Sequence, residues 1–218
     1  MSMIARWPRW ARILAVVVLA GAVIVGVPAI RGSMLRAAGW VLVVDDPVEP
    51  ADIVVVAVDA DGAGVLEAAD LVHSGIATRV AVFADPPDQV DREFLRRGLP
   101  YEDAAAQRTR QLRSLGVTAI EQIPRAVPGT EAEAEVLPDW CDQHQFRSVV
   151  IVSARDHSRR LRRVLHRSMR GHTTKVTVRP ARYSVFDPDR WWETRTGIRT
   201  EIIELQKLLL DVVRHPMS

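Results

Sequence analysis

Short aliphatic runs alternate with amphipathic segments along most of the chain. The runs at 52–58, 79–83 and 148–152 are rich in β-branched residues and almost free of polar positions, which is typical of strands buried on both faces. Weaker runs at 118–123 and 175–178 complete the set. The pattern predicts an α/β fold, a doubly wound, mainly parallel five-stranded Rossmann-like sheet. We expect the first and fourth strands to be parallel neighbours at its centre, as in a 3-2-1-4-5 order.

The segments between these strands carry apolar residues at helical spacing. They predict helices at 63–73, 101–115, 130–145, 156–170 and 198–213. In the last helix the periodic positions are Ile202, Leu205, Leu208, Leu209 and Val212. A stretch with Pro188, Trp191 and Trp192 is expected to pack against it, and residues 84–100 form a less regular insertion.

One apolar segment stands apart from this alternation. Residues 13–30 contain no charge, and a helix of that length spans roughly 27 Å, close to the hydrocarbon thickness of a bilayer. Trp7, Trp10 and Trp40 flank it, as interfacial anchors do. We therefore expect one uncleaved transmembrane helix. The alternative is a cleaved secretion signal, because Ala20-Gly21-Ala22 fits a small-x-small cleavage site, although the apolar run continues past it.

The distribution of arginines sets the expected topology. Three arginines and the α-amine precede the segment, whereas only Arg31 and Arg36 follow it, so the positive-inside rule favours a cytoplasmic N-terminus. The sequence thus predicts a single-pass protein of the plasma membrane with an extracytoplasmic domain. Its expected parts are a cytoplasmic segment at 1–12, the anchor at 13–30, a connector at 31–50 and the α/β domain at 51–214.

Charge and cysteine content exclude several classes of protein. The net charge is +2, but residues 1–36 hold five arginines and no acid, which leaves 24 bases against 27 acids in the remainder. The main domain is therefore not expected to bind nucleic acid. A single cysteine, Cys141, permits neither an intramolecular disulfide nor a cysteine zinc cluster, and we predict a small buried hydrophobe.

Candidate chemistry follows the fourth predicted strand. In a doubly wound sheet, ligands bind outside the carboxyl ends of the strands, where the strand order reverses. A Ser-rich turn with an imidazole and guanidinium groups suits a phosphate or carboxylate, or acid–base work on a phosphorylated substrate. The residues concerned are Ser153, His157, Ser158, Arg159 and Arg160. The alternative is that the arginines of this helix are its solvated face, above all from Arg162 onward.

Acidic residues follow the first strand and begin the helix at 130. Asp59 and Asp61 are able to bind a divalent cation with the help of Glu131 or Glu133, or they are turn formers before a glycine. Thr130 is a candidate N-cap. These interpretations leave the metal and any other cofactor open.

With these residues in view, the chain resembles the YdcF-like family over about residues 50–210, including its SanA/ElyC-type membrane-anchored envelope members. Five groups of residues carry the resemblance. They are residues 50–52 before an aliphatic strand, residues 73–77 at the end of a helix, residues 129–134, Ser153 together with residues 157–160, and Glu201 or Glu204 together with Lys207. In the family a Thr-x-x-Glu and a His-x-x-Arg motif line the pocket, which implies Thr130, Glu133, His157 and Arg160 here.

The chain departs from the family at two turns. Where the family has glycines after the first and second strands, this sequence has 58–61 and 84–87 without any. Glycines there let the backbone approach a ligand closely, so the family's ligand is expected to bind differently or not at all.

The resemblance implies a membrane-anchored protein of cell-envelope biogenesis that binds or acts on a phosphorylated or nucleotide-like cell-wall precursor. His157 would be the general acid/base, Arg159 and Arg160 the anion clamp, and Glu133 or Asp59 a second acid/base or a metal ligand. The alternative is a non-catalytic ligand-sensing or scaffolding module of the envelope. The sequence decides neither whether the protein is an enzyme nor its oligomeric state.

Overall fold

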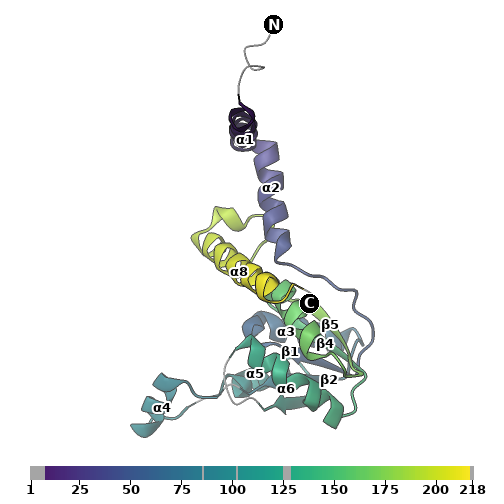
Figure 1. Cartoon of the computed structure of the whole chain (residues 1–218). Helices are drawn as coiled ribbons and strands as arrows, with labels where there is room; N and C mark the ends of the chain where they lie inside the picture. Colours follow the sequence, from purple (N-terminus) through teal and green to yellow (C-terminus); the bar gives the residue numbers. More distant parts are fainter. Residues whose placement is uncertain (1–7, 85, 102, 125–128, 217–218) are drawn as a thin grey trace.

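A five-stranded parallel sheet organises the chain in this computed structural model, which describes residues 8–84, 86–101, 103–124 and 129–216 (Figure 1). The strand order is β3-β2-β1-β4-β5 and every neighbouring pair is parallel, which confirms the predicted fold class and order. The strands are β1 (Ile53–Val56), β2 (Arg79–Phe83), β3 (Ala119–Ile123), β4 (Ser148–Ser153) and β5 (Lys175–Pro180). As predicted, β1 and β4 are central neighbours.

Helices cover both faces of the sheet, and the alternation of side chains in the strands explains why. In β1, Ile53 and Val55 pack toward one face, with α6 (Thr130–Gln143) and α7 (Ser158–Ser168). Val54 and Val56 pack toward the other face. That face is covered by α3 (Asp61–His73) and α5 (Ala104–Ser114). Because all four residues of β1 are buried, the strand is aliphatic throughout.

The irregular insertion contains one short helix, α4 (Gln89–Arg96). Asp88 and Asp91 form a reciprocal capping box at its start, which fixes where the helix begins. None of its residues is buried, and it projects from the domain (Figure 1).

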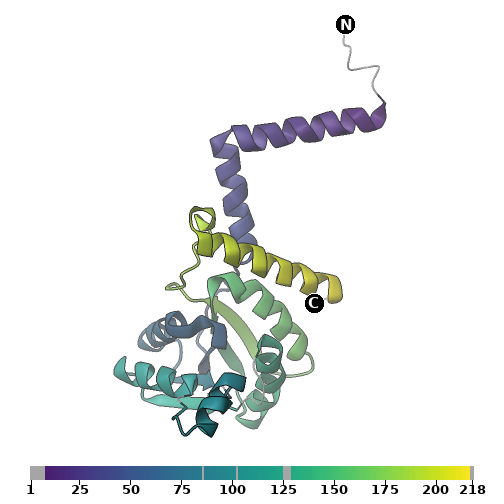
Figure 2. The same ribbon diagram turned by 90° about the vertical axis from the view of Figure 1, so that its left-hand side faces the viewer.

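The last helix, α8 (Arg195–Arg214), crosses the end of the domain where the N-terminal helices attach (Figure 2). It follows a 3-10 helix, η4 (Trp191–Glu193). Trp191 packs with Leu205 and Leu208, as the sequence predicted for this stretch. Two other apolar residues at helical spacing in α8, Ile202 and Leu209, do not belong to its buried face, because their side chains are exposed.

The apolar N-terminal segment is divided between two helices, α1 (Arg9–Gly26) and α2 (Pro28–Val41), and differs here from the single helix expected at 13–30. Pro28 begins α2, and Val27 before it is extended at φ −102° and ψ 105°, because a residue preceding proline is disfavoured in helical geometry. Within the described residues, no helix has the length and apolar character needed to cross a membrane.

The expected connector at 31–50 is also different in the structure, because α2 continues to Val41 and the chain after it packs on the domain. Leu42 and Val43 are buried beside Phe186 and Leu208. Gly39 lets α2 approach the 188–191 loop, since a Cβ on it would lie 2.4 Å from the Pro188 carbonyl oxygen.

A buried carboxylate fastens α3 to the end of β5. Glu67 is fully buried and accepts hydrogen bonds from Arg179 Nε at 3.1 Å, from Arg182 Nε at 2.8 Å and from the Arg182 backbone N–H at 3.0 Å. Two guanidinium groups and one amide therefore compensate the charge.

Candidate functional site

The carboxyl ends of β1 and β4 lie side by side in the centre of the sheet, with Val56 opposite Val152. A 3-10 helix, η2 (Val58–Ala60), follows β1, and another, η3 (Arg155–His157), follows β4 and leads into α7. The beginning of α6 and the buried side of α8 complete the surroundings. The predicted meeting of the two strand ends is confirmed.

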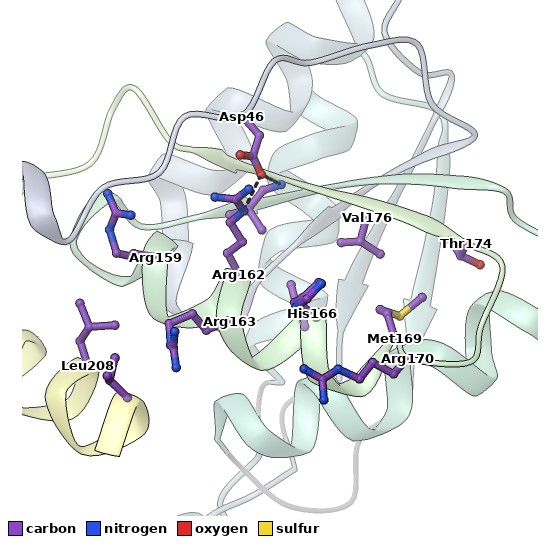
Figure 3. A pocket seen from close by; sticks show the side chains of 13 residues that line it. Asp46, Arg159, Arg162, Arg163, His166, Met169, Arg170, Thr174, Val176 and Leu208 are labelled. Carbon is purple, nitrogen blue, oxygen red and sulfur yellow. Dashed lines mark hydrogen bonds and ion pairs between the residues drawn. The ribbon is translucent and has the colours of Figure 1, made fainter. Parts of the chain in front are cut away.

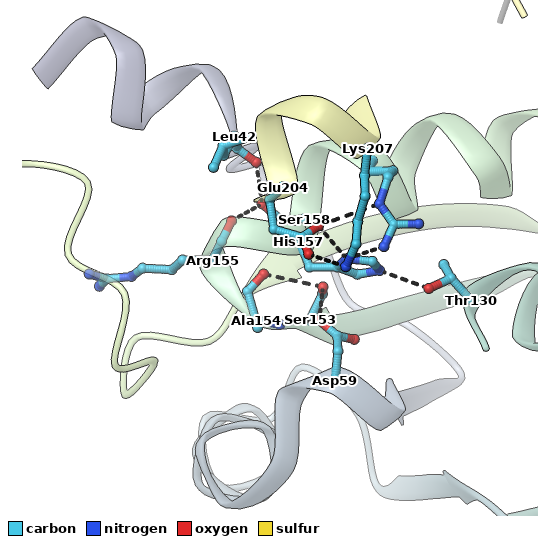
Figure 4. A network of polar contacts seen from close by, with 11 residues as sticks. Leu42, Asp59, Thr130, Ser153, Ala154, Arg155, His157, Ser158, Glu204 and Lys207 are labelled. Carbon is cyan, nitrogen blue, oxygen red and sulfur yellow. Dashed lines mark hydrogen bonds and ion pairs between the residues drawn. The ribbon is translucent and has the colours of Figure 1, made fainter. Parts of the chain in front are cut away.

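His157 is the centre of a polar network drawn from three helices (Figure 4). Its Nε2 lies 3.1 Å from Thr130 Oγ1 at the start of α6. Its Nδ1 lies 2.9 Å from Arg160 Nη2 and 3.4 Å from Glu204 Oε2 of α8. Lys207 Nζ donates to Glu204 Oε1 at 2.6 Å. The structure therefore brings Thr130, His157 and Arg160 together, as the motifs implied.

The two contacts of His157 Nδ1 compete for one atom. Arg160 has only N–H donors, so Nδ1 must offer it a lone pair, whereas a hydrogen bond to Glu204 needs an Nδ1–H. The contact with Arg160 fits a ring whose proton is on Nε2 and points to Thr130, whereas the contact with Glu204 fits a ring that carries a proton on Nδ1.

Glu204 carries the compensating negative charge. Burial alone would raise its pKa, but hydrogen bonds from His157 and Lys207, with the charges of His157 and Arg160, lower the pKa to about 2. Arg160 Nε and Lys207 Nζ, which are both cationic groups, lie 3.5 Å and 2.6 Å from the Glu204 carboxylate. These two cations line a cavity of about 200 Å³ with Arg214; the acids Glu131 and Asp211 line it as well, and Asp211 is paired with Arg163 and Arg167. This side of the site is suited to an anion.

The side of the site next to η2 is acidic. A cavity of about 400 Å³ is lined by Asp59, Asp61 and Asp156 and by no lysine or arginine. Asp59 accepts hydrogen bonds from Ser153 Oγ and from the Ala154 N–H, each at 3.0 Å, so Ser153 is occupied in holding Asp59.

Asp61 is exposed at the start of α3 and takes a positive φ of 43°. Arg108 Nη2 donates to it at 3.1 Å. Where the family resemblance implies a glycine turn, the backbone here therefore reaches positive φ through an aspartate.

The possible metal ligands do not come together. Glu133 is buried and its Oε2 accepts the Val58 N–H at 3.2 Å, while Glu131 lies 3.9 Å from Arg167. Across the described part of the chain, no group of three or more His, Cys, Asp or Glu side chains is arranged to hold a metal ion.

Ser158 and Arg159 point away from the network, and the expected clamp of Arg159 with Arg160 is not formed. The Ser158 Oγ accepts the Val44 N–H at 3.0 Å and donates to the Arg155 carbonyl at 2.8 Å. The Arg159 guanidinium donates to the carbonyls of Trp40, Val41 and Val43, where α2 ends. Cations near the last carbonyls of a helix stabilise it, so both residues attach α2 to α7.

Two further acids belong to this region and were not singled out as site residues from the sequence. Burial raises the pKa of Asp156, and the charges of Glu204 and Asp59 add to this effect. Glu201 is 1% exposed, and neither of its carboxylate oxygens has a hydrogen-bond partner among the described residues. Burial and the charge of Asp156 raise the pKa of Glu201 to about 7. The structure thus holds one carboxyl that ionises near neutral pH.

Cys141 takes no part in the site. It is fully buried in α6 among apolar side chains, and burial followed by the charge of Asp142 raises its pKa to about 12. The prediction of a small buried hydrophobe is confirmed.

Comparisons of the chain with family models, with curated proteins and with solved structures found no match. The chemistry of the site therefore has to be argued from its geometry. An imidazole, two cations that meet at one carboxylate and a nearby buried acid can bind an anion and move a proton to or from it.

Proposed function

We propose that this site binds a phosphorylated or nucleotide-like small molecule. The observation that carries the proposal is that two cations, Arg160 and Lys207, meet at the single carboxylate of Glu204 and line a cavity at the carboxyl edge of the sheet. A phosphoryl group there would be held by charge-assisted hydrogen bonds. The acidic cavity beside Asp59 favours hydroxyl or amine donors of the same ligand, as sugars and nucleosides carry.

In the enzymatic form of the proposal, His157 is the acid–base group. Its Nε2 lies 3.1 Å from Thr130 Oγ1, and its Nδ1 lies 2.9 Å from Arg160 Nη2. A ligand oxygen that replaced the Thr130 contact would meet a group able to give or take a proton. Glu204 would stabilise the imidazolium, because its carboxylate is already 3.4 Å from Nδ1.

We further propose a place in the cell envelope, with residues 13–30 as the membrane anchor and the domain outside the cytoplasm. This part rests on the apolar segment, on the arginine asymmetry and on the resemblance to the YdcF-like family of SanA/ElyC type. A reporter that is active only in the cytoplasm, fused after Ser218, should then stay silent, and strong activity would overturn the orientation.

A non-catalytic ligand sensor is the second candidate. The observation in its favour is that His157, Arg160, Glu204 and Lys207 are bonded to one another, which suits a preformed binding site as well as a reacting one. The replacement of the expected glycine turn by Asp61 points the same way, since a side chain there keeps the backbone away from a ligand.

Thermal unfolding of the full chain with a nucleoside diphosphate tests the binding proposal. At about 100 times Kd, the ligand should stabilise the protein by about 2.7 kcal/mol. Arg160→Ala should abolish this shift. The matched control is Arg162→Ala, because Arg162 lies on the same helix but is half-exposed and pairs with Asp46. Arg167 is a poor control, since it is bonded to the buried Asp211.

A retained shift in Arg160→Ala, or an equal loss in both variants, would overturn the site. His157→Gln separates the two forms of the proposal. An enzyme would lose turnover and keep ligand stabilisation, whereas a sensor would have no turnover to lose.

A further inference from the structure

The apolar side of α8 faces outward, and its acids face inward. Ile198, Ile202, Leu209 and Val213 are 40%, 50%, 62% and 70% exposed. Their spacing places them along one line of the helix, which we call the α8 stripe. The three acids of the helix, Glu201, Glu204 and Asp211, are all buried. An apolar line turned toward solvent is costly unless another surface covers it.

The exposed charges of α8 are all positive. With its acids buried, the helix presents only bases to solvent: Arg195, Arg199 and Arg214, which we call the basic flank, and Lys207, which is bonded to Glu204 in the His157 site. The adjoining α2 exposes Arg31 and Arg36 and contains no acid. In both views α8 lies at the end of the domain from which α2 leads toward the N-terminus (Figures 1 and 2).

A groove beside α8 repeats the combination of apolar and basic groups. It has a volume of about 690 Å³ and lies between α7, β5 and α8 (Figure 3). Leu208 and Val212 of α8 line it, and Arg162, His166 and Arg170 of α7 add basic groups. Asp46 is its single acidic lining residue.

We propose that the α8 stripe lies in the headgroup region of an anionic lipid bilayer, with the basic flank against the lipid phosphates. Helices that lie in a membrane interface bury an apolar face and carry lysine and arginine beside it. A second copy of the chain fits less well, because a twofold pairing through the stripe would bring the basic flank against itself. The proposal needs no ligand in the His157 site.

Lipid contact is measured with the full chain incorporated into vesicles of phosphatidylglycerol and phosphatidylcholine. A fluorophore on Leu209→Cys should be quenched by lipid-borne quenchers and protected from aqueous iodide. The matched control is a fluorophore on Ala106→Cys, an exposed position of α5, on the opposite face of the sheet from α7. The unsubstituted chain is the labelling blank, because Cys141 is buried.

Serine substitution of Arg195, Arg199 and Arg214 tests how much the basic flank contributes to binding of α8 to the anionic bilayer. Each base near an anionic surface contributes about a fivefold factor, so their joint loss should lower the association of α8 with the bilayer about 100-fold. Because the three side chains are exposed, the melting temperature should not change.

Equal iodide quenching at Leu209→Cys and Ala106→Cys would overturn the proposal. So would protection of Leu209→Cys that persists in uncharged phosphatidylcholine vesicles, or that grows with protein density and yields α8–α8 cross-links. Arg160→Ala should keep full lipid contact, which separates failure of this proposal from failure of the ligand site.

Discussion

Glu201 makes stability depend on pH in a direction opposite to that of most carboxylates. The side chain is buried, and its two oxygens have no hydrogen-bond partner among the described residues. Burial and the charge of Asp156 raise its pKa from 4.5 to about 7. The folded protein therefore holds this group as the neutral acid at pH values where the unfolded chain has already ionised it.

The sign and the size of the effect follow from this difference. Below pH 4.5 both states are protonated and the full stability is present. Between pH 4.5 and about 7 the unfolded chain binds fewer protons, so the free energy of unfolding falls as pH rises. Each unit of difference in pKa between the folded and unfolded states corresponds to about 1.4 kcal/mol. The free energy of unfolding therefore falls by about 3 kcal/mol at most by pH 8.

The perturbation is Glu201→Gln, followed by urea unfolding of the full chain at pH 5 and pH 8. The variant should match the original chain within about 1 kcal/mol at pH 5 and exceed it by up to about 3 kcal/mol at pH 8. Glu204→Gln is the control one helical turn further on. Since the pKa of Glu204 is lowered to about 2, its charge stabilises the fold above pH 4.5, and this contribution is lost as pH falls toward 2.

Glu204→Gln should accordingly be less stable than the original chain at pH 8, the reverse of Glu201→Gln. Parallel pH profiles for the original chain and Glu201→Gln between pH 5 and 8 would refute the reasoning.

Three further outcomes are expected. Gly39→Ala should destabilise the fold by about 1–3 kcal/mol, because its Cβ meets the Pro188 carbonyl, whereas Gly32→Ala on the same helix has free space and should be neutral or stabilising; thermal unfolding compares them. Glu67→Ala should cost about 2–3 kcal/mol in urea unfolding, since it removes charge-assisted hydrogen bonds to Arg179 and Arg182, and a cost below about 1 kcal/mol would contradict that role. Cys141 should resist alkylation at pH 8 until denaturant is added, as mass spectrometry would show.

The central strands were predictable because a strand buried on both faces has to be aliphatic throughout. Four consecutive buried residues in Ile53–Val56 leave no position for a polar side chain. The meeting of the two strand ends follows from topology alone. His157 and Arg160 directly follow the fourth strand and therefore lie at this edge of the sheet, where the sequence placed them.

The partners of Ser158 and Arg159 could not be predicted in the same way. They bind carbonyl and amide groups of residues 40–44, more than one hundred positions earlier in the chain. Backbone groups leave no trace in the types of residue that carry them. Residues 157–160 therefore look like one continuous polar motif in the sequence. In the structure His157 and Arg160 face the site, whereas Ser158 and Arg159 bind the backbone of residues 40–44.

The orientation of α8 was missed for a different reason. Apolar periodicity marks a line along a helix but does not say whether that line faces the protein or its surroundings. A signal was present in the acids, because Glu201, Glu204 and Asp211 fall together on the opposite side of the helix from Ile202 and Leu209. Two of these buried acids face cations of α7: Arg160 lies beside Glu204, and Arg163 and Arg167 pair with Asp211.

The packing of residues 42–49 changes where the folding unit begins. Leu42 and Val43 fill an apolar cluster with Phe186 and Leu208, and Asp45 and Glu49 pair with Arg179 and Lys175 of β5. A polypeptide that begins after residue 50 would thus lose residues 42–49, which pack on the edge strand β5 and against α7 and α8. A fragment that keeps this interior intact therefore has to start near the end of α2, because a truncation at the apparent boundary of the α/β pattern would remove part of it.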